Sequence, residues 1–292
     1  MKRAYIEISN ACNLSCSFCP SPGITGQRQW MSDELFQTTL DGLQGVVEEV
    51  YLHVLGEPLL HPRLEFFLKA CNDRNLKVNI TTNGLLIETC TSVLLESANL
   101  RQINFSVHAL HEMTSTKEAS QALTAILSFS TQAMEQRPDL YINLRLWNED
   151  SRSEPALHHW NAETWQRISA AINGSSTLPP AFDPRKKRQR LNGRISLHMD
   201  SRFEWPADSE KESSRTRGTC QALKTHCAIL ADGRIVACCL DYQGDLELGH
   251  VLKDGIRAAL DSPRARAMRK GFDQRNLVEP FCQNCTFCQR FS

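Results

Sequence analysis

The chain has 292 residues, and its 33 basic and 33 acidic side chains give a formal net charge of zero at pH 7. This balance excludes an overall electrostatic attraction to nucleic acid or to an anionic membrane, so such a partner would need a local patch. The N-terminus lacks the apolar core of a signal peptide, and no run of about 18 apolar residues occurs. We therefore expect a cytoplasmic protein with no membrane partner.

Short stretches rich in β-branched residues alternate with longer stretches of helical period over the first 200 residues. This alternation is typical of βα units around a parallel sheet and predicts an α/β fold. The apolar patterns place strands at residues 4–9, 49–54, 77–81, 102–107, 141–147 and 194–199. They place helices near residues 33–43, 63–74, 87–97, 121–136 and 163–171.

The regular pattern weakens after Asn148. Residues 148–193 are polar and contain prolines, and we interpret them as an irregular elaboration around the sixth βα unit. Residues 185–190 read Arg-Lys-Lys-Arg-Gln-Arg and form the one basic patch. The patch has no interleaved aromatic residues to stack on bases, so we interpret it as a solvated loop. Nucleic acid is therefore a possible partner that the sequence does not favour.

Three cysteines follow the first predicted strand with the spacing Cys12-x3-Cys16-x2-Cys19. This loop would lie at the carboxyl end of a parallel strand, where α/β barrels build their sites. Clustered cysteines in a reducing compartment indicate metal binding or redox chemistry. A structural zinc site or a ferredoxin-type cluster needs a fourth ligand, and the next cysteine is the distant Cys71. Three cysteines on a 4Fe-4S cluster would leave one iron open.

With this loop, the chain resembles the radical S-adenosylmethionine (radical SAM) enzymes. The resemblance implies a partial (β/α)6 TIM-like barrel, with Cys12, Cys16 and Cys19 as catalytic residues and ligands of a 4Fe-4S cluster. It also implies that SAM binds the open iron and is reductively cleaved to a 5'-deoxyadenosyl radical, which abstracts hydrogen from the substrate. Phe18 matches the aromatic residue that lies beside the adenine in the family.

Further matches follow the later strands. Gly56-Glu57-Pro58 resembles the Gly-Gly-Glu segment of the family, although Leu55 replaces its first glycine. The resemblance assigns cofactor binding to this segment and to Asn83, Ser106 and Arg145, with Ser106 near the ribose and Arg145 near the carboxylate. Polar groups at the end of the sixth strand are weaker candidates for substrate contact or proton transfer, namely His198, Asp200 and Glu204.

Seven of the twelve cysteines lie in the last 73 residues, and an Asp232-Gly233 turn predicts a β-hairpin among them. This tail resembles the auxiliary-cluster extensions of radical SAM enzymes, the SPASM domain and its shortened twitch form. The resemblance implies one auxiliary 4Fe-4S cluster held by Cys220, Cys238, Cys282 and Cys285. Cys239 and Cys288 are alternative ligands that could substitute for their neighbours or bind a further iron, and Cys227 is expected in the hairpin core. A structural zinc site is the alternative, because Cys-x2-Cys pairs also suit zinc.

The resulting division is a core barrel over residues 1–205 and a SPASM- or twitch-like module over residues 218–292. The resemblance ranks modification of a peptide or protein first and a small-molecule dehydrogenation or epimerisation of a carbohydrate-like substrate second. RNA modification ranks third and is favoured only by the basic run. It also implies a reductant such as flavodoxin or ferredoxin. The alternative from another class is a non-catalytic iron–sulfur or zinc protein that senses redox state or binds a partner.

Overall fold

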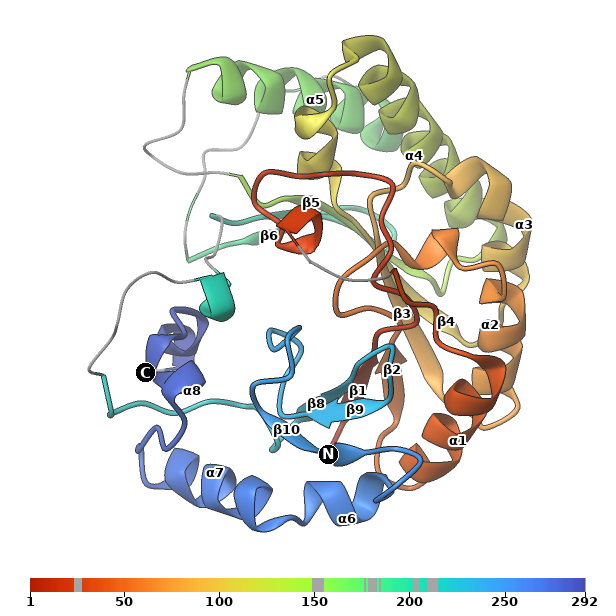
Figure 1. The fold of residues 1–292 in the computed structure, drawn as a ribbon. Coiled ribbons are helices and arrows are strands. Elements are labelled where there is room, and N and C mark those ends of the chain that lie inside the picture. The colour runs from red at the N-terminus through yellow and green to blue at the C-terminus, as the bar shows by residue number, and fades with distance from the viewer. Residues whose placement is uncertain are drawn as a thin grey trace. The chain divides into compact units, whose positions relative to one another are not determined.

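The computed structural model in Figure 1 describes the chain except for residues 24–27, 149–154, 176, 178–182, 184, 202–204, 209–214 and 292. The chain folds as two compact units. The first contains Met1–Asn13, Phe18–Val78 and Phe203–Ser292, and the second contains Leu14–Ser17 and Asn79–Arg202. The predicted boundaries at residues 205 and 218 stay predictions.

In the first unit, the C-terminal strands extend the sheet begun by the N-terminal strand (Figure 1). Strand β1 pairs in parallel with β2 on one side and with β8 on the other, and β8, β9 and β10 pair antiparallel. The predicted hairpin is therefore confirmed, but its first strand lies beside β1. The strands are β1 (Arg3–Ile6), β2 (Glu49–Tyr51), β8 (His226–Ile229), β9 (Arg234–Val236) and β10 (Glu247–His250).

Two helices of the first unit, α1 and α7, each begin after a capping serine. The Ser32 hydroxyl accepts a hydrogen bond from the backbone of Leu35 at 3.1 Å and caps α1. Phe36 of α1 stacks on Phe67 of α2 with their ring centroids 3.9 Å apart, which joins the two helices. The elements are α1 (Asp33–Leu43), α2 (Leu64–Asn72), α6 (Ile256–Leu260), α7 (Pro263–Asp273), α8 (Pro280–Asn284), and the 3₁₀ helices η1 (Ser21–Gly23), η2 (Pro58–Leu60), η4 (Pro206–Asp208) and η5 (Phe287–Phe291).

The second unit continues the alternation of strands and helices, so the predicted α/β class is confirmed. Its strands lie in the order β3-β4-β5-β7-β6, with β4, β5 and β7 parallel. Phe105 on β4 packs on Phe129 of α4, so alternate residues of β4 face either the helices or the opposite side of the sheet. The elements are β3 (Lys77–Thr82), α3 (Ile87–Glu96), β4 (Leu100–Phe105), η3 (Val107–Glu112), α4 (Thr116–Gln136), β5 (Tyr141–Leu146), α5 (Pro155–Asn173), β6 (Arg188–Asn192) and β7 (Ile195–Met199).

Two expectations for residues 148–193 were wrong. Helix α5 begins at Pro155, a residue suited to the first turn of a helix, so residues 155–162 are regular. The second half of the basic run is β6, which pairs antiparallel with β7, and is not a loop. Gly193 has a φ of +50° in the tight connection between them. The Asn192-Gly193 pair is a strong hairpin signal that the sequence interpretation overlooked.

Burial of apolar side chains stabilises each of the two units. Ile6, Phe36 and Phe67 are fully buried in the first unit, and Phe105 and Ile126 are fully buried in the second. All twelve cysteines lie in the described ranges and none forms a disulfide. Among the described helices, none is long and apolar enough to cross a membrane.

Candidate cluster and cofactor sites

The segment that leads into Cys12 is fixed against the segment after β2. The backbone N–H of Glu57 donates to the carbonyl of Ala11 at 2.8 Å. Gly56 has a φ of +73°, and a Cβ at this position would overlap the carbonyl oxygens of Ser9 and Ala11. Only glycine permits so close an approach of two backbones with this φ. Gly56 therefore sets the path of the chain just before Cys12.

The carboxylate of Glu57 is almost fully buried and caps its own turn. Its Oε1 accepts a hydrogen bond from the backbone N–H of Leu59 at 3.0 Å. Pro58 occupies the first turn of η2, where its missing N–H needs no partner. The structure thus holds the predicted Gly56-Glu57-Pro58 segment rigidly. Its contact with SAM stays a prediction.

A buried carboxylate that the sequence analysis missed supports the same segment. Glu7, the residue directly after β1, is 4% exposed, and its Oε1 accepts from the backbone N–H of Leu55 at 3.1 Å. Its Oε2 accepts from the backbone N–H of Ala231 at 3.1 Å. Burial raises the pKa of Glu7, although the two N–H donors oppose this shift. An acidic residue inside the apolar stretch Ala4–Ile8 was the available signal.

The three cysteines after β1 differ in their surroundings. Cys16 is buried, while Cys12 and Cys19 are partly exposed. The Cys19 thiol donates to the Ser21 hydroxyl at 3.3 Å. Phe18 is partly buried beside Cys19 in the sequence. Cys12 and Cys19 belong to the first unit and Cys16 to the second, and the role of all three as cluster ligands stays a prediction.

In the second unit, Asn83 and Ser106 follow neighbouring strands. The backbone N–H of Ser106 donates to the carbonyl of Thr82 at 2.8 Å, which places Ser106 next to the end of β3. The side-chain oxygen of Asn83 accepts from the backbone of Leu85 at 3.0 Å and shapes the turn after β3. Their predicted contacts with the cofactor are untested, but both residues lie at the carboxyl ends of strands.

Arg145 belongs to an aromatic cluster at the end of β5. Its guanidinium lies 4.4 Å from the ring centroid of Trp147, a cation–π distance. The indole N–H of Trp147 donates to Nδ1 of His198 at 3.3 Å. The His108 Nδ1 lies 3.1 Å from the carbonyl of Arg145, which can only accept, so this nitrogen carries a proton. The sequence analysis did not single out Trp147, because it fitted the pattern of the predicted strand at residues 141–147.

His198 is neutral and Asp200 is paired. Burial, followed by the charge of Arg145, lowers the pKa of His198 to about 4. Asp200 is 3% exposed and its Oδ1 accepts from Nζ of Lys187 at 2.8 Å. Asp200 is therefore tied to the segment that enters β6. Glu204 lies outside the described residues.

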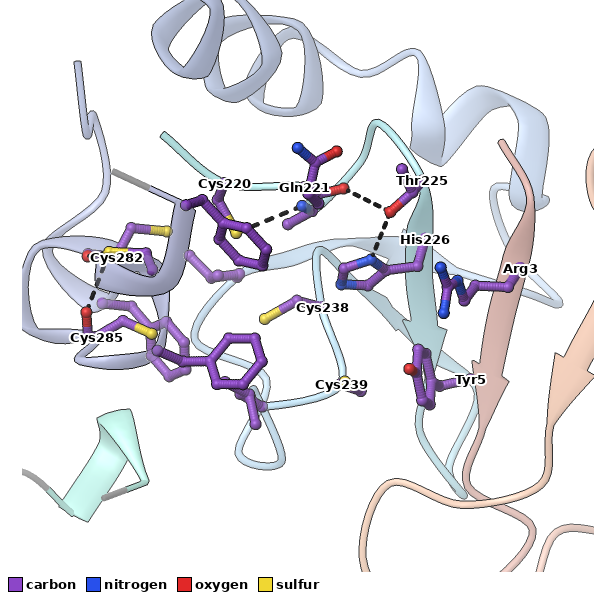
Figure 2. Close-up of a pocket in the computed structure, with 17 residues that line it drawn as sticks. Arg3, Tyr5, Cys220, Gln221, Thr225, His226, Cys238, Cys239, Cys282 and Cys285 are labelled. Atoms are coloured by element: carbon purple, nitrogen blue, oxygen red, sulfur yellow. Dashed lines mark hydrogen bonds between the residues drawn. The ribbon is translucent and has the colours of Figure 1, made fainter. Parts of the chain in front are cut away.

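Six tail cysteines line one cavity of about 410 Å³ inside the first unit (Figure 2). Cys220 precedes β8, Cys238 follows β9, and Cys282 lies on α8, so three separate segments supply thiols. Arg3, Tyr5 and His226 form another part of the cavity wall (Figure 2). The cysteines are Cys220, Cys238, Cys239, Cys282, Cys285 and Cys288.

The cysteine thiols of this cavity are the donors that iron–sulfur clusters use. A tetrahedral zinc site needs all its sulfurs about 2.3 Å from one point. The corners of a 4Fe-4S cluster instead accept cysteines from several directions around a larger volume. The cysteine donors and the apolar cavity therefore suit an iron–sulfur cluster.

The cavity changes the acidity of the thiols. Burial raises the pKa of Cys220, of Cys238 and of Cys282. A hydrogen bond from the Cys285 thiol, together with the charge of Arg215, lowers the pKa of Cys288 to about 6. Because cysteine binds metal as a thiolate, loading iron here would release protons.

Cys227 does not line the cavity. It lies in β8 with no exposed surface, and burial raises its pKa to about 12. The expectation that Cys227 is a core residue of the hairpin is confirmed. Cys71 is equally buried in α2, with its pKa also raised to about 12 by burial.

The α/β fold and the two groups of cysteines define an iron–sulfur protein. The sequence profile of the Radical SAM superfamily matches residues 6–127, and that of the iron-sulfur cluster-binding SPASM domain matches residues 220–286. The chain belongs to the radical SAM superfamily. Its cofactors are a 4Fe-4S cluster and SAM, and the SPASM domain adds auxiliary iron–sulfur binding. The resemblance seen in the sequence is confirmed.

One curated relative is the tungsten-containing aldehyde ferredoxin oxidoreductase cofactor-modifying protein of Pyrococcus furiosus. It is 33% identical over 89 residues, which are 30% of this chain and 25% of the relative. Across the curated relatives that match, the matched region spans about a quarter to a third of their length.

Two solved structures share the fold. BtrN in complex with AdoMet and 2-DOIA has a TM-score of 0.55 and 13% identity, covering 98% of this chain and 92% of BtrN. SuiB of Streptococcus suis bound to precursor peptide SuiA has a TM-score of 0.57 and 18% identity, covering 91% of this chain and 66% of SuiB. At these identities the similarity establishes the fold.

Proposed function

We propose that this radical SAM enzyme modifies a side chain of a peptide or protein. The observation that carries this choice of substrate is the similarity in fold to SuiB in its complex with a precursor peptide. When bound, the cluster and SAM supply the 5'-deoxyadenosyl radical that abstracts hydrogen from the substrate. Cys12, Cys16 and Cys19 hold that cluster.

The surrounding residues orient the cofactor. Gly56 fixes the chain before Cys12. The side chains of Glu57 and Asn83 accept hydrogen bonds from their own turns, and the backbone of Ser106 is hydrogen-bonded to Thr82. Arg145 offers a guanidinium to the carboxylate of SAM, held in place by the ring of Trp147. Phe18 offers a ring to the adenine, and Pro58 keeps the turn of η2 rigid.

The tail holds one auxiliary 4Fe-4S cluster, with Cys220, Cys238, Cys282 and Cys285 as ligands. The shared cavity of about 410 Å³ supports this assignment, because it brings these four thiols to one place. Cys239 and Cys288 line the same cavity and are the alternative ligands, which could replace one of these four. Four cysteine ligands leave no iron open, so we assign this cluster to electron transfer rather than substrate binding.

A second candidate is the dehydrogenation of a small molecule. It is favoured by the similarity to BtrN in complex with 2-DOIA, which extends over nearly the whole length of both chains. RNA modification ranks third, since the basic run is partly engaged. Lys187 pairs with Asp200 at 2.8 Å, and Arg190 donates to the carbonyl of Gly193 at 2.6 Å.

Fractionated cell extract distinguishes these substrates. The reconstituted enzyme, with SAM and dithionite, is given extract fractions above and below a 1–2 kDa ultrafiltration limit, and 5'-deoxyadenosine is quantified. Stimulation by a fraction that loses its effect after protease treatment would support a peptide or protein. Stimulation only by a small, protease-resistant fraction would support the second candidate. Sensitivity to ribonuclease would support RNA.

We propose that a flavodoxin or ferredoxin supplies the electron for the cleavage of SAM. Dithionite takes the place of this protein in the assay above. We propose the cytoplasm as the location, because twelve free cysteines are typical of a reducing compartment. Replacing dithionite with a reduced flavodoxin should sustain formation of 5'-deoxyadenosine. A complete failure of both flavodoxin and ferredoxin would argue against these reductants.

A further inference from the structure

Arg215 makes two short contacts with the last turn of cysteines. Its Nη2 donates to the backbone carbonyl of Cys285 at 2.7 Å and to Sγ of Cys288 at 2.7 Å. Cys285 and Cys288 are 8% and 2% exposed, so the guanidinium meets them away from bulk water. Both residues line the cysteine cavity.

The two contacts fix the turn that joins α8 to η5. The Sγ of Cys288 also lies 3.1 Å from the carbonyl of Cys285, so that carbonyl, the thiol and the guanidinium form one compact group. A guanidinium presents several N–H donors in a fixed plane, which lets Arg215 hold a backbone oxygen and a sulfur together. A lysine ammonium carries the same charge without this planar geometry.

A cation in this position affects the redox properties of a nearby cluster. Reduction adds one negative charge to the cluster, and a neighbouring positive charge favours the reduced form. The Arg215 side chain is partly buried, so salt screens its charge less than that of an exposed side chain.

We propose that Arg215 is a positioning residue of the auxiliary cluster and raises its reduction potential through the turn of Cys285 and Cys288. The inference rests on the proposed function, because it requires that the tail cysteines hold a cluster. It assigns Arg215 a role outside the segment matched by the SPASM profile, which begins at residue 220. A higher potential would suit a cluster that accepts an electron from the substrate.

The test compares Arg215→Gln with Arg215→Lys in the full chain. Both are made in a Cys16→Ala background, so that the redox signal comes from the tail. Iron per chain and the midpoint potential are measured after anaerobic reconstitution. The matched control is Arg217→Gln, the same chemical change at an exposed position two residues away.

We expect Arg215→Gln to keep its iron and to shift the midpoint potential to a more negative value. Arg215→Lys should shift it less, and Arg217→Gln should match the parent. An unchanged potential in Arg215→Gln with iron retained would overturn the proposal. If Arg215→Gln loses its iron, the test uses Arg215→Lys instead. An Arg215→Lys variant that keeps its iron and has the same midpoint potential as Arg217→Gln would overturn the proposal. Absence of tail iron in the parent would instead refute the auxiliary cluster itself.

Discussion

The buried carboxylate of Glu7 accepts a hydrogen bond at 3.1 Å from the backbone N–H of Ala231, 224 residues later in the chain. Its other oxygen accepts from Leu55, the residue before Gly56. One side chain thus joins the residue after β1 both to the turn of the tail hairpin and to the segment that leads into Gly56. The region matched by the SPASM profile is therefore tied through Glu7 to the segment before Gly56 within the first unit.

Glu7→Gln should weaken this junction. The amide has one acceptor oxygen and places an NH₂ donor against one of two buried N–H groups, which costs about 1–3 kcal/mol of unfolding free energy. Urea unfolding of the reconstituted protein measures this change. Glu96→Gln, at an exposed position on α3, is the matched control and should change stability by less than about 0.5 kcal/mol. Equal effects in the two variants would show that the Glu7 junction contributes nothing.

Gly56→Ala should disturb the approach to Cys12. Alanine at a positive φ costs about 1–2 kcal/mol, and overlap with two carbonyl oxygens adds about 1–3 kcal/mol. Gly174→Ala is the control, because Gly174 has a φ of +72° with nothing within 4 Å of the added Cβ. We expect Gly56→Ala alone to lose SAM binding, measured by equilibrium dialysis. SAM affinity equal to that of Gly174→Ala would contradict the close approach of the two backbones.

Much of the fold followed from local patterns in the sequence. Strand and helix periods located α1 and most strands, because burial of alternate residues imposes the same period on sequence and structure. The pairing of β8 with β1 is a contact between distant residues, which a local pattern does not encode. For the same reason, the bridging role of Glu7 was missed. β6 was missed because its arginines hid a hairpin signal at Asn192-Gly193.

The candidate sites were also predictable from the sequence only in part. Cysteine spacing indicated both iron–sulfur groups, because sulfur ligands are chemically specific and close in sequence. The cavity joins Cys220 and Cys238 to α8, more than 40 residues further along the chain, and only the fold brings them together. Arg215 and Trp147 were not singled out, since each acts by touching another side chain rather than by forming a motif.

Acid should destabilise the protein partly through His198. Its folded-state pKa of about 4 lies below the ordinary value of 6.5, so the unfolded state binds the proton first as pH falls. Stability is therefore fully present above about pH 6.5 and is lost progressively down to about pH 4. Protonation would also break the hydrogen bond from Trp147 to Nδ1.

We expect His198→Gln to lose less stability than the wild type between pH 7.5 and 5.5. The difference should be about 1 kcal/mol after allowance for screening at this partly exposed side chain. Urea unfolding at the two pH values, monitored by tryptophan fluorescence, gives the comparison. His159→Gln, on the exposed face of α5, should follow the wild type. Parallel losses in wild type and His198→Gln would contradict the lowered pKa.

Removal of Cys282 and Cys285 together should lower bound iron by about four atoms per chain, the content of one cluster. Cys227→Ala is the matched control, because Cys227 is buried in β8 but does not line the cavity. It should reduce stability while leaving the iron content unchanged. Iron and acid-labile sulfide are quantified after anaerobic reconstitution. Full iron in the double variant would disprove the assignment of these two ligands.

The most direct test of the central claim is the joint measurement of iron and 5'-deoxyadenosine in wild type and in Cys16→Ala. After anaerobic reconstitution and addition of SAM and dithionite, the wild type should hold about eight irons per chain and form 5'-deoxyadenosine. Cys16→Ala should keep its fold and the tail cluster, with about four irons, and form none. Formation of 5'-deoxyadenosine by Cys16→Ala would contradict the account.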